Sequence, residues 1–338
     1  MFNSFFRQRL GAALASCVLL GFSAGALAQP IITATTYDLS PGVQATVFSP
    51  STSPWGVQRP AILMIPGGGF LSSDPTGLLP LAQYYAQQGF VTVATTYRVA
   101  PPYPRPADFN AADPKYGVWP AQINDVRKVV WTLREFAPQL QIDPNRIAAL
   151  GVSAGGMLAA HLGLSDVRDP TNTYSSKVQR IISISGPWDP ANVVERFRLA
   201  AINPWIWPNP YAADPNSLGI VMTLFGGTPQ TLADNLAPTR LEEDIRPASP
   251  RTYVSNASTS VAATMAPTLL LHGANDQLVP PYTAQAVTPC QEINNKVAGK
   301  CQIYVAPGLG HELPQPGTQA MNNYLNYMNT FLTNWMAQ

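Results

Sequence analysis

The chain has 338 residues, of which only 12% are charged, and its 20 basic and 19 acidic residues nearly cancel. Nothing in this sparse, nearly neutral charge balance suggests a polyanionic partner, so we expect no nucleic-acid partner. The length suits one large α/β domain with an insertion, and two domains are the less favoured alternative.

The amino terminus is typical of a secretory signal peptide, which we place at residues 1–28. Arg7 and Arg9 make a basic start, residues 10–27 are small and apolar, and Ala26-Leu27-Ala28 offers an A-x-A cleavage site. We therefore expect a mature chain of residues 29–338, exported to the periplasm or the extracellular space.

Two other interpretations of the amino terminus are less favoured. A membrane anchor fits poorly because Gly, Ala and Ser dilute an apolar run that is short for a membrane span. A lipoprotein cleavage box at Leu14-Ala15-Ser16-Cys17 would leave too few apolar residues before the cut. We therefore expect no stable membrane anchor.

Removal of the signal peptide also removes Cys17 and leaves Cys290 and Cys301. Two cysteines this close together in an exported chain predict a disulfide, which would contribute roughly 3 kcal/mol in the chain-entropy model. Two separate buried thiols are the alternative. The chain's three histidines do not cluster with these cysteines, so we expect no metal site, and no other cofactor is indicated.

Strands and helices alternate along most of the chain. Strands are predicted at residues 33–37, 43–48, 61–65, 91–97, 147–150, 180–185, 268–272 and 302–305. Helices are predicted at residues 78–88, 121–136, 157–162 and 318–336. This alternation predicts an α/β fold, a mostly parallel central sheet with helices on both faces.

Residues 188–260 interrupt the alternation and are rich in Pro, Asn and aromatic residues. We interpret them as a cap inserted over the carboxyl edge of the sheet, where open α/β sheets bind ligands. The aromatic residues of this segment suit an acyl pocket or a sugar-stacking surface, and equally ordinary packing: Trp188, Trp205, Trp207 and Phe225.

Gly151-Val152-Ser153-Ala154-Gly155 is the most informative motif. It lies between an apolar strand-like run and a helix-like run, as in a nucleophile elbow, a tight turn that lifts a serine hydroxyl above the sheet. The alternative is a glycine-rich connector of another α/β fold, so the interpretation depends on partners elsewhere in the chain.

A serine nucleophile needs a base, and three histidines are candidates. His311 lies in a glycine-rich loop after the last strand, and its late position in the chain favours it as general base. His161 lies within the helix after the motif and is expected to pack there. His272 ends an apolar strand, where a structural hydrogen bond is expected. An ordinary surface histidine is the alternative for His311.

The third member of a triad would be a carboxylate that accepts a hydrogen bond from the base. Asp276 follows the strand at 268–272 in a turn and suits this role. Glu312 is a rival, but it adjoins His311 and would reach that ring poorly. A solvated turn residue is the other alternative for Asp276.

Backbone donors for an oxyanion are expected at Ala154, which follows the serine, and at Gly68 or Gly69, which follow the strand at 61–65. Consecutive glycines allow bare backbone to approach a reacting carbonyl. A flexible turn is the alternative. The Gly-Lys-Ser/Thr ending of a phosphate-binding loop is absent.

With these residues assembled, the chain resembles the α/β-hydrolase superfamily, and most of all its secreted carboxylesterase and carbohydrate-esterase branch related to hormone-sensitive-lipase-type enzymes. The resemblance covers about residues 61–336. It is carried by Pro66-Gly67-Gly68-Gly69-Phe70, Tyr97-Arg98-Val99-Ala100-Pro101, residues 119–126, residues 142–147, the serine motif, Ala248-Ser249-Pro250, residues 272–276 and Gly310-His311.

The resemblance implies an α/β-hydrolase fold with Ser153, Asp276 and His311 as the triad. It also implies Gly68, Gly69 and Ala154 as the oxyanion hole, and a structural role for Asp125. The chain departs from the branch at Pro66, which stands where the oxyanion motif usually opens with histidine.

The expected function is hydrolysis of carboxylic esters through an acyl-enzyme, with a small-molecule or carbohydrate ester as substrate. A serine peptidase or a lipase of the same fold is the alternative, although such peptidases usually add a large amino-terminal propeller. A catalytically silent binding module is the alternative of another class, and it predicts a damaged triad. The natural ester and the oligomeric state stay open at this point.

Overall fold

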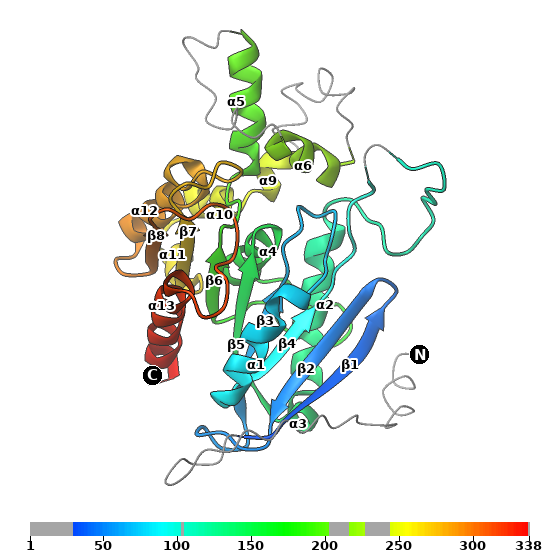
Figure 1. The fold of residues 1–338 in the computed structure, drawn as a ribbon, viewed down its shortest axis with the longest axis vertical. Helices are drawn as coiled ribbons and strands as arrows, with labels where there is room; N and C mark the ends of the chain where they lie inside the picture. Colours follow the sequence, from blue (N-terminus) through cyan, green and yellow to red (C-terminus); the bar gives the residue numbers. More distant parts are fainter. Residues whose placement is uncertain (1–29, 103–104, 203–215, 227–243, 337–338) are drawn as a thin grey trace.

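The computed structural model describes residues 30–102, 105–202, 216–226 and 244–336. The predicted signal peptide therefore lies outside the described residues. The eight strands form one sheet in the order β1-β2-β4-β3-β5-β6-β7-β8 (Figure 1). Their bounds are β1 Ile32–Ser40, β2 Val43–Pro50, β3 Arg59–Ile65, β4 Val91–Thr95, β5 Ile142–Val152, β6 Arg180–Ile184, β7 Thr268–Gly273 and β8 Cys301–Ala306.

Only β2 runs against its neighbours: it pairs antiparallel with β1 and β4, and every other pair in the sheet is parallel. The mostly parallel sheet expected from the alternation of elements is confirmed. In the parallel part, all strands end at the same edge of the sheet, where the predicted site residues follow them.

Two helical layers cover the sheet. One contains α2 (Ala121–Glu135), α4 (Ala154–Leu164), α10 (Pro250–Asn256), α11 (Thr259–Thr264) and α12 (Val287–Lys296), and the other contains α1 (Leu79–Gln87) and α13 (Gln319–Met336). Side chains alternate along β3, so that Leu63 and Ile65 pack in the first layer and Ile62 and Met64 in the second. The described residues also include four short helical segments: η1 Thr76–Leu78, α3 Ala137–Leu140, α9 Arg246–Ala248 and η4 Pro281–Gln285.

Two helices of the predicted insertion, α5 (Pro190–Ile202) and α6 (Asn216–Leu224), stand beyond the carboxyl edge of the sheet, outside both layers (Figure 1). Val194, Val221 and Met222 are buried in a small apolar cluster between them. By contrast, Val254 of α10 and Ala262 of α11 belong to the main core against α4 and α12. Residues 203–215 and 227–243 of the predicted insertion, including Trp205 and Trp207, lie outside the described residues.

The strand β5 begins at Ile142, five residues earlier than predicted, because its start is polar and partly exposed. The helix α12 was not predicted, since Pro289 and several polar residues interrupt its apolar spacing. Within α12, Cys290 forms a disulfide with Cys301 at the start of β8. The predicted disulfide is confirmed.

The helix α13 is the longest described helix, with 18 residues. It packs one apolar side, including Tyr324, Met328 and Leu332, against the sheet. No helix among the described residues has both the length and the apolar character needed to cross a membrane.

Candidate active site

The turn from β5 into α4 presents Ser153 at the carboxyl edge of the sheet. Ser153 has φ 52° and ψ −120°, a strained conformation for a residue with a side chain. A Cβ atom at Gly151 would lie 2.0 Å from the Gly155 carbonyl oxygen, and one at Gly155 would lie 2.1 Å from the Ile65 carbonyl oxygen. The two glycines of the motif are therefore required by the close approach of three backbone segments.

His311 lies in the loop after β8 and faces Ser153. Its Nε2 atom is 2.8 Å from the Ser153 Oγ atom, and its Nδ1 atom is 2.8 Å from the Asp276 Oδ2 atom. A Cβ atom at Gly273 would lie 2.1 Å from the Gly310 carbonyl oxygen, so the end of β7 and the His311 loop are in backbone contact. The structure thus joins Ser153, His311 and Asp276 in one hydrogen-bonded chain.

Asp276 is fully buried at its side chain, whereas 25% of the His311 side chain is exposed. Burial alone would raise the pKa of Asp276, but hydrogen bonds from His272 and His311 outweigh it and lower that pKa to about 2. Its Oδ1 atom also accepts a hydrogen bond of 2.8 Å from the Val279 backbone N–H. The carboxylate is therefore ionised at neutral pH and held from several sides.

His272 is a site residue that the sequence did not reveal. The structural hydrogen bond expected for it exists, with the Nε2 atom 2.6 Å from the Val279 carbonyl oxygen. The same Nε2 atom lies 3.1 Å from Asp276 Oδ2, the oxygen that contacts His311. The only signal in the sequence was the position of His272 on the strand that leads into the Asp276 turn.

His161, a candidate base, and Glu312, the rival carboxylate, both lie apart from the hydrogen-bonded chain of Ser153, His311 and Asp276. His161 is buried within α4, with its Nε2 atom 2.7 Å from the Ala248 carbonyl oxygen, as expected for a packed helix residue. Burial lowers its pKa to about 3, so it is neutral at physiological pH. Glu312 is exposed, and its carboxylate lies beside Gly310.

The glycine loop after β3 borders the serine. Gly69 and Ala154 line the same hollow as Ser153. Gly68, with φ 112°, turns the loop, and its carbonyl accepts hydrogen bonds from the Leu71 and Ser72 backbone N–H groups at 2.9 and 3.1 Å. The hydroxyl of the buried Tyr97 donates to the Pro66 carbonyl oxygen at 3.1 Å. This contact fixes the loop at the position where the usual histidine is missing.

The hollow beside Ser153 has apolar walls. Its lining residues are Gly69, Phe70, Ser153, Ala154, Met157, Pro187, Pro190, Val193, Ile220, Val221, Leu224, Leu278, Val279 and Gln285. The side-chain amide of Gln285 is already hydrogen-bonded within the protein. Its oxygen accepts from the Asp189 backbone N–H, and its nitrogen donates to the Asp189 carbonyl oxygen. No charged side chain is among these lining residues, so the hollow suits an uncharged group.

Of the four aromatic residues singled out above in the predicted insertion, Trp188 and Phe225 are described, and both serve packing. Trp188 is buried and donates from its indole nitrogen to the Ser183 hydroxyl at 3.2 Å. Phe225 packs beside Trp119, with ring centroids 6.2 Å apart. Neither lines the hollow at Ser153.

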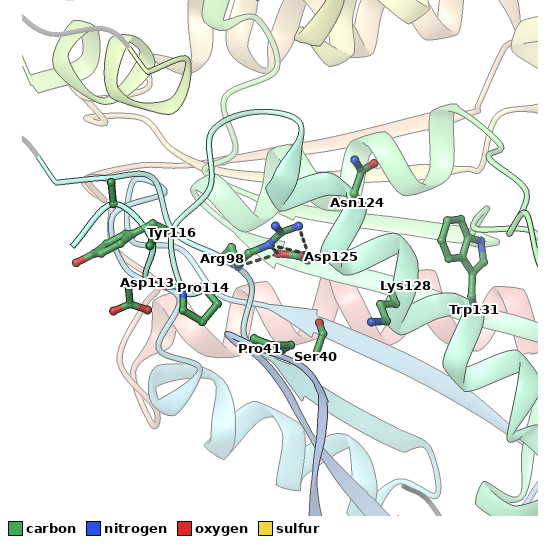
Figure 2. Close-up of a pocket in the computed structure, with 12 residues that line it drawn as sticks. Ser40, Pro41, Arg98, Asp113, Pro114, Tyr116, Asn124, Asp125, Lys128 and Trp131 are labelled. Atoms are coloured by element: carbon green, nitrogen blue, oxygen red, sulfur yellow. Dashed lines mark hydrogen bonds and ion pairs between the residues drawn. The ribbon is translucent and has the colours of Figure 1, made fainter. Parts of the chain in front are cut away.

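Figure 2 shows a second hollow, at the side of α2, and Ser153 is not among its lining residues. Its centre holds Arg98, whose backbone N–H and guanidinium donate to the Asp125 carboxylate at 2.8–3.2 Å. Asp125 on α2 thereby fixes the chain that follows β4, in agreement with the structural role that the resemblance implied.

The sequence of this chain matches a known protein family and is similar to several named proteins. The model of the BD-FAE family matches residues 49–289. The probable carboxylic ester hydrolase LipM of Mycobacterium tuberculosis is 25% identical over 232 residues, covering 67% of this chain and 43% of LipM. The arylacetamide deacetylase of Oryctolagus cuniculus is 30% identical over 155 residues, covering 45% of this chain and 35% of that protein. The chain thus spans less than half of each of these two relatives.

Solved structures show the same fold. Esterase 2 of Thermogutta terrifontis, phosphoramylated by tabun, superposes with a TM-score of 0.62 at 20% identity, covering 89% of this chain and 94% of that one. The acetyl ester-xyloside bifunctional hydrolase of Caldicellulosiruptor lactoaceticus gives a TM-score of 0.60 at 20% identity, with 87% of each chain covered.

Proposed function

This chain belongs to the BD-FAE family of α/β-hydrolase esterases, and from that premise we propose that it hydrolyses carboxylic esters through an acyl-enzyme on Ser153. The observation that carries the proposal is the chain of two 2.8 Å contacts from Ser153 through His311 to Asp276. The three residues come from three separate loops at one edge of the sheet, an arrangement that structural packing alone does not require.

In the proposed reaction, His311 Nε2 takes the proton of the Ser153 hydroxyl as its oxygen attacks the ester carbonyl. The ionised Asp276 holds the Nδ1–H tautomer and stabilises the imidazolium that forms. The backbone N–H groups of Ala154 and Gly69 donate to the oxyanion, and Gly68 supports the loop that carries Gly69. The imidazolium then protonates the leaving alcohol, and water repeats the sequence to release the acid.

The hollow beside Ser153 supports an ester with a small uncharged acyl group. Its walls are apolar. Ile220 of α6 lies close to Gly69, because a Cβ atom at Gly69 would be 3.2 Å from the Ile220 Cδ1 atom. A charged acyl group would lose its hydration there without compensation. The alcohol portion is proposed to be a small molecule or a carbohydrate.

We further propose that residues 1–28 direct export and are removed, and that α5 and α6 form the described part of a cap over the site. The disulfide between Cys290 and Cys301 supports an oxidising compartment, because such bonds are rare in reducing ones. Together these features support the proposal of an exported esterase in the periplasm or the extracellular space.

The proposal is tested with p-nitrophenyl acetate, butyrate and octanoate. We expect the wild-type protein to hydrolyse the two short esters faster than the octanoate ester. Ser153→Ala should lower kcat on the order of 10⁴-fold or more, whereas Ser260→Ala, at an exposed serine of α11, should leave it unchanged. Equal rates for wild type and Ser153→Ala on every ester would favour the silent binding module instead.

A further inference from the structure

The apolar hollow beside Ser153 is small. Its cavity volume is about 40 Å³. Since one water molecule needs roughly 10–15 Å³ of such volume, the hollow has room for roughly three water-sized groups. An acetyl group fits this room and a butyryl group fills it, whereas an octanoyl chain is far too long for it.

The lining of the hollow comes from the main core and from the two helices that stand beyond the sheet. Phe70, Ala154 and Met157 line it from the main core, where all three are buried. The helices α5 and α6 supply five further lining residues: Pro190, Val193, Ile220, Val221 and Leu224. The size of the hollow therefore depends on the side chains that α5 and α6 present to it.

Ile220 differs from the other lining residues of these two helices. Among the described residues that α5 and α6 contribute, it alone is half-buried, and the other four are buried. Val193 and Val221 pack in the cluster between the two helices, and Leu224 packs in the main core. These buried side chains hold the helices in place, so the size of residue 220 can change at the smallest cost in packing.

Ile220 also lies against the residue that is proposed to donate to the oxyanion. Its Cδ1, Cγ1 and Cγ2 atoms are 3.2, 3.3 and 3.7 Å from the place that a Cβ atom of Gly69 would take. The end of α6 is tied to the main core, because the Leu224 carbonyl oxygen accepts a hydrogen bond of 2.9 Å from the Trp119 backbone N–H. Ile220 is therefore held where the first carbons of an acyl chain would enter the hollow.

We propose that Ile220 sets the longest acyl chain that the site accepts, and that the protein is selective for acetyl esters and esters of similarly short acids. This inference rests on the proposed esterase function, since it concerns the same serine. A longer chain either displaces α6 or stays outside the apolar walls, and in both cases it loses burial. Because a single methylene in a hydrophobic pocket changes kcat/KM roughly 10- to 200-fold, the size of residue 220 should have a measurable effect.

The test measures kcat/KM for p-nitrophenyl acetate, butyrate and octanoate in wild type, Ile220→Ala and Ile220→Phe. The ratio of octanoate to acetate should rise about tenfold or more in Ile220→Ala, because the smaller side chain lengthens the hollow. The ratio of butyrate to acetate should fall about tenfold or more in Ile220→Phe, because the ring fills the hollow. Incomplete folding lowers both rates of one preparation equally, so it leaves these ratios unchanged.

Thr223→Ala is the matched control. Thr223 lies on α6 and donates from its hydroxyl to the Gly219 carbonyl oxygen at 2.8 Å, but it is not among the residues that line the hollow. Its truncation weakens α6 without enlarging the hollow, so both ratios should equal those of wild type. A second comparison, between p-nitrophenyl acetate and 1-naphthyl acetate, changes only the alcohol. Their ratio should be the same in wild type and Ile220→Ala, because Ile220 is proposed to contact the acyl group.

The outcomes separate this inference from the function on which it rests. A wild-type protein that hydrolyses none of these esters would overturn both. An active wild type, with unchanged acyl ratios in Ile220→Ala and Ile220→Phe, would overturn the inference and leave the esterase function standing. The same holds for a ratio change in Thr223→Ala as large as that in Ile220→Ala, or for a change confined to the comparison of the two alcohols.

Discussion

At the scale of single residues, the proposed triad of Ser153, His311 and Asp276 depends on the neighbouring groups that hold it in place. Gly151, Gly155 and Gly273 each stand where a Cβ atom would come within 2.0–2.1 Å of backbone, so bare backbone contact sets the position of Ser153 and the His311 loop. Asp276 in turn is held by Val279 and by a second imidazole, that of His272.

His272 provides the residue-scale prediction. We propose that it is a positioning residue, because it contacts Asp276 and not Ser153 or the hollow. His272→Leu should lower kcat for p-nitrophenyl butyrate about tenfold, because the carboxylate that orients His311 loses one of its two imidazole partners, while KM should change little. His272→Gln, which can still donate to Asp276, should recover part of the loss.

Both His272 variants must be compared with their urea unfolding curves. A purely structural role predicts that both lose stability and active protein together, with kcat per folded molecule unchanged. That result would contradict a positioning role for His272.

At the scale of elements, β5 and α4 place Ser153, the proposed nucleophile, and α4 carries a buried histidine that affects stability. His161 packs between the rings of Trp119 and Tyr253, and its Nδ1 atom has no hydrogen-bond partner among the described residues. Burial lowers its pKa to about 3, against about 6.5 for an unfolded histidine. Between about pH 3 and about pH 6.5, His161 therefore binds a proton in the unfolded state but not in the folded state.

We accordingly expect the stability supplied by neutral His161 to be complete above about pH 6.5 and to be lost as the pH falls toward 3. Urea unfolding at pH 7 and pH 5 should show a decrease in the free energy of unfolding that is about 2 kcal/mol larger in wild type than in His161→Gln. Asp276, whose pKa is lowered to about 2, affects stability only below about pH 5 and so does not enter the comparison of pH 7 with pH 5. An equal decrease in both proteins would contradict the expected state of His161.

The strands and helices also show which parts of the fold can be predicted from the sequence. Long apolar or strongly periodic segments such as β3, β6, β7 and α13 were predicted because burial and amphipathic spacing are local properties of the chain. The polar start of β5 and the proline-containing α12 were not, because pairing with β3 and packing against α10 stabilise them. The contact of His272 with Asp276 and the hydrogen bonds between Gln285 and Asp189 also depend on tertiary structure, so they could not be predicted from the sequence.

At the scale of the whole molecule, the parallel sheet separates two chemical environments. Its carboxyl edge carries the hydrogen-bonded Ser153, His311 and Asp276 beside an apolar hollow, and its amino edge carries a basic hollow around Lys177 and Lys300. Charged residues are sparse over the chain, and six of its 20 basic residues line the hollow at the edge away from the serine. The proposed triad could be predicted from motif and chain order, whereas the basic hollow joins residues that lie far apart in the sequence and could not.

The most direct measurement of the central claim is covalent labelling of the nucleophile. The whole protein is treated with a fluorophosphonate, digested, and examined by mass spectrometry. The account predicts that the label is found on the peptide that contains Ser153, that labelling abolishes hydrolysis of p-nitrophenyl butyrate, and that Ser153→Ala takes up no label. An unlabelled wild-type protein, or equal labelling of wild type and Ser153→Ala, would contradict it.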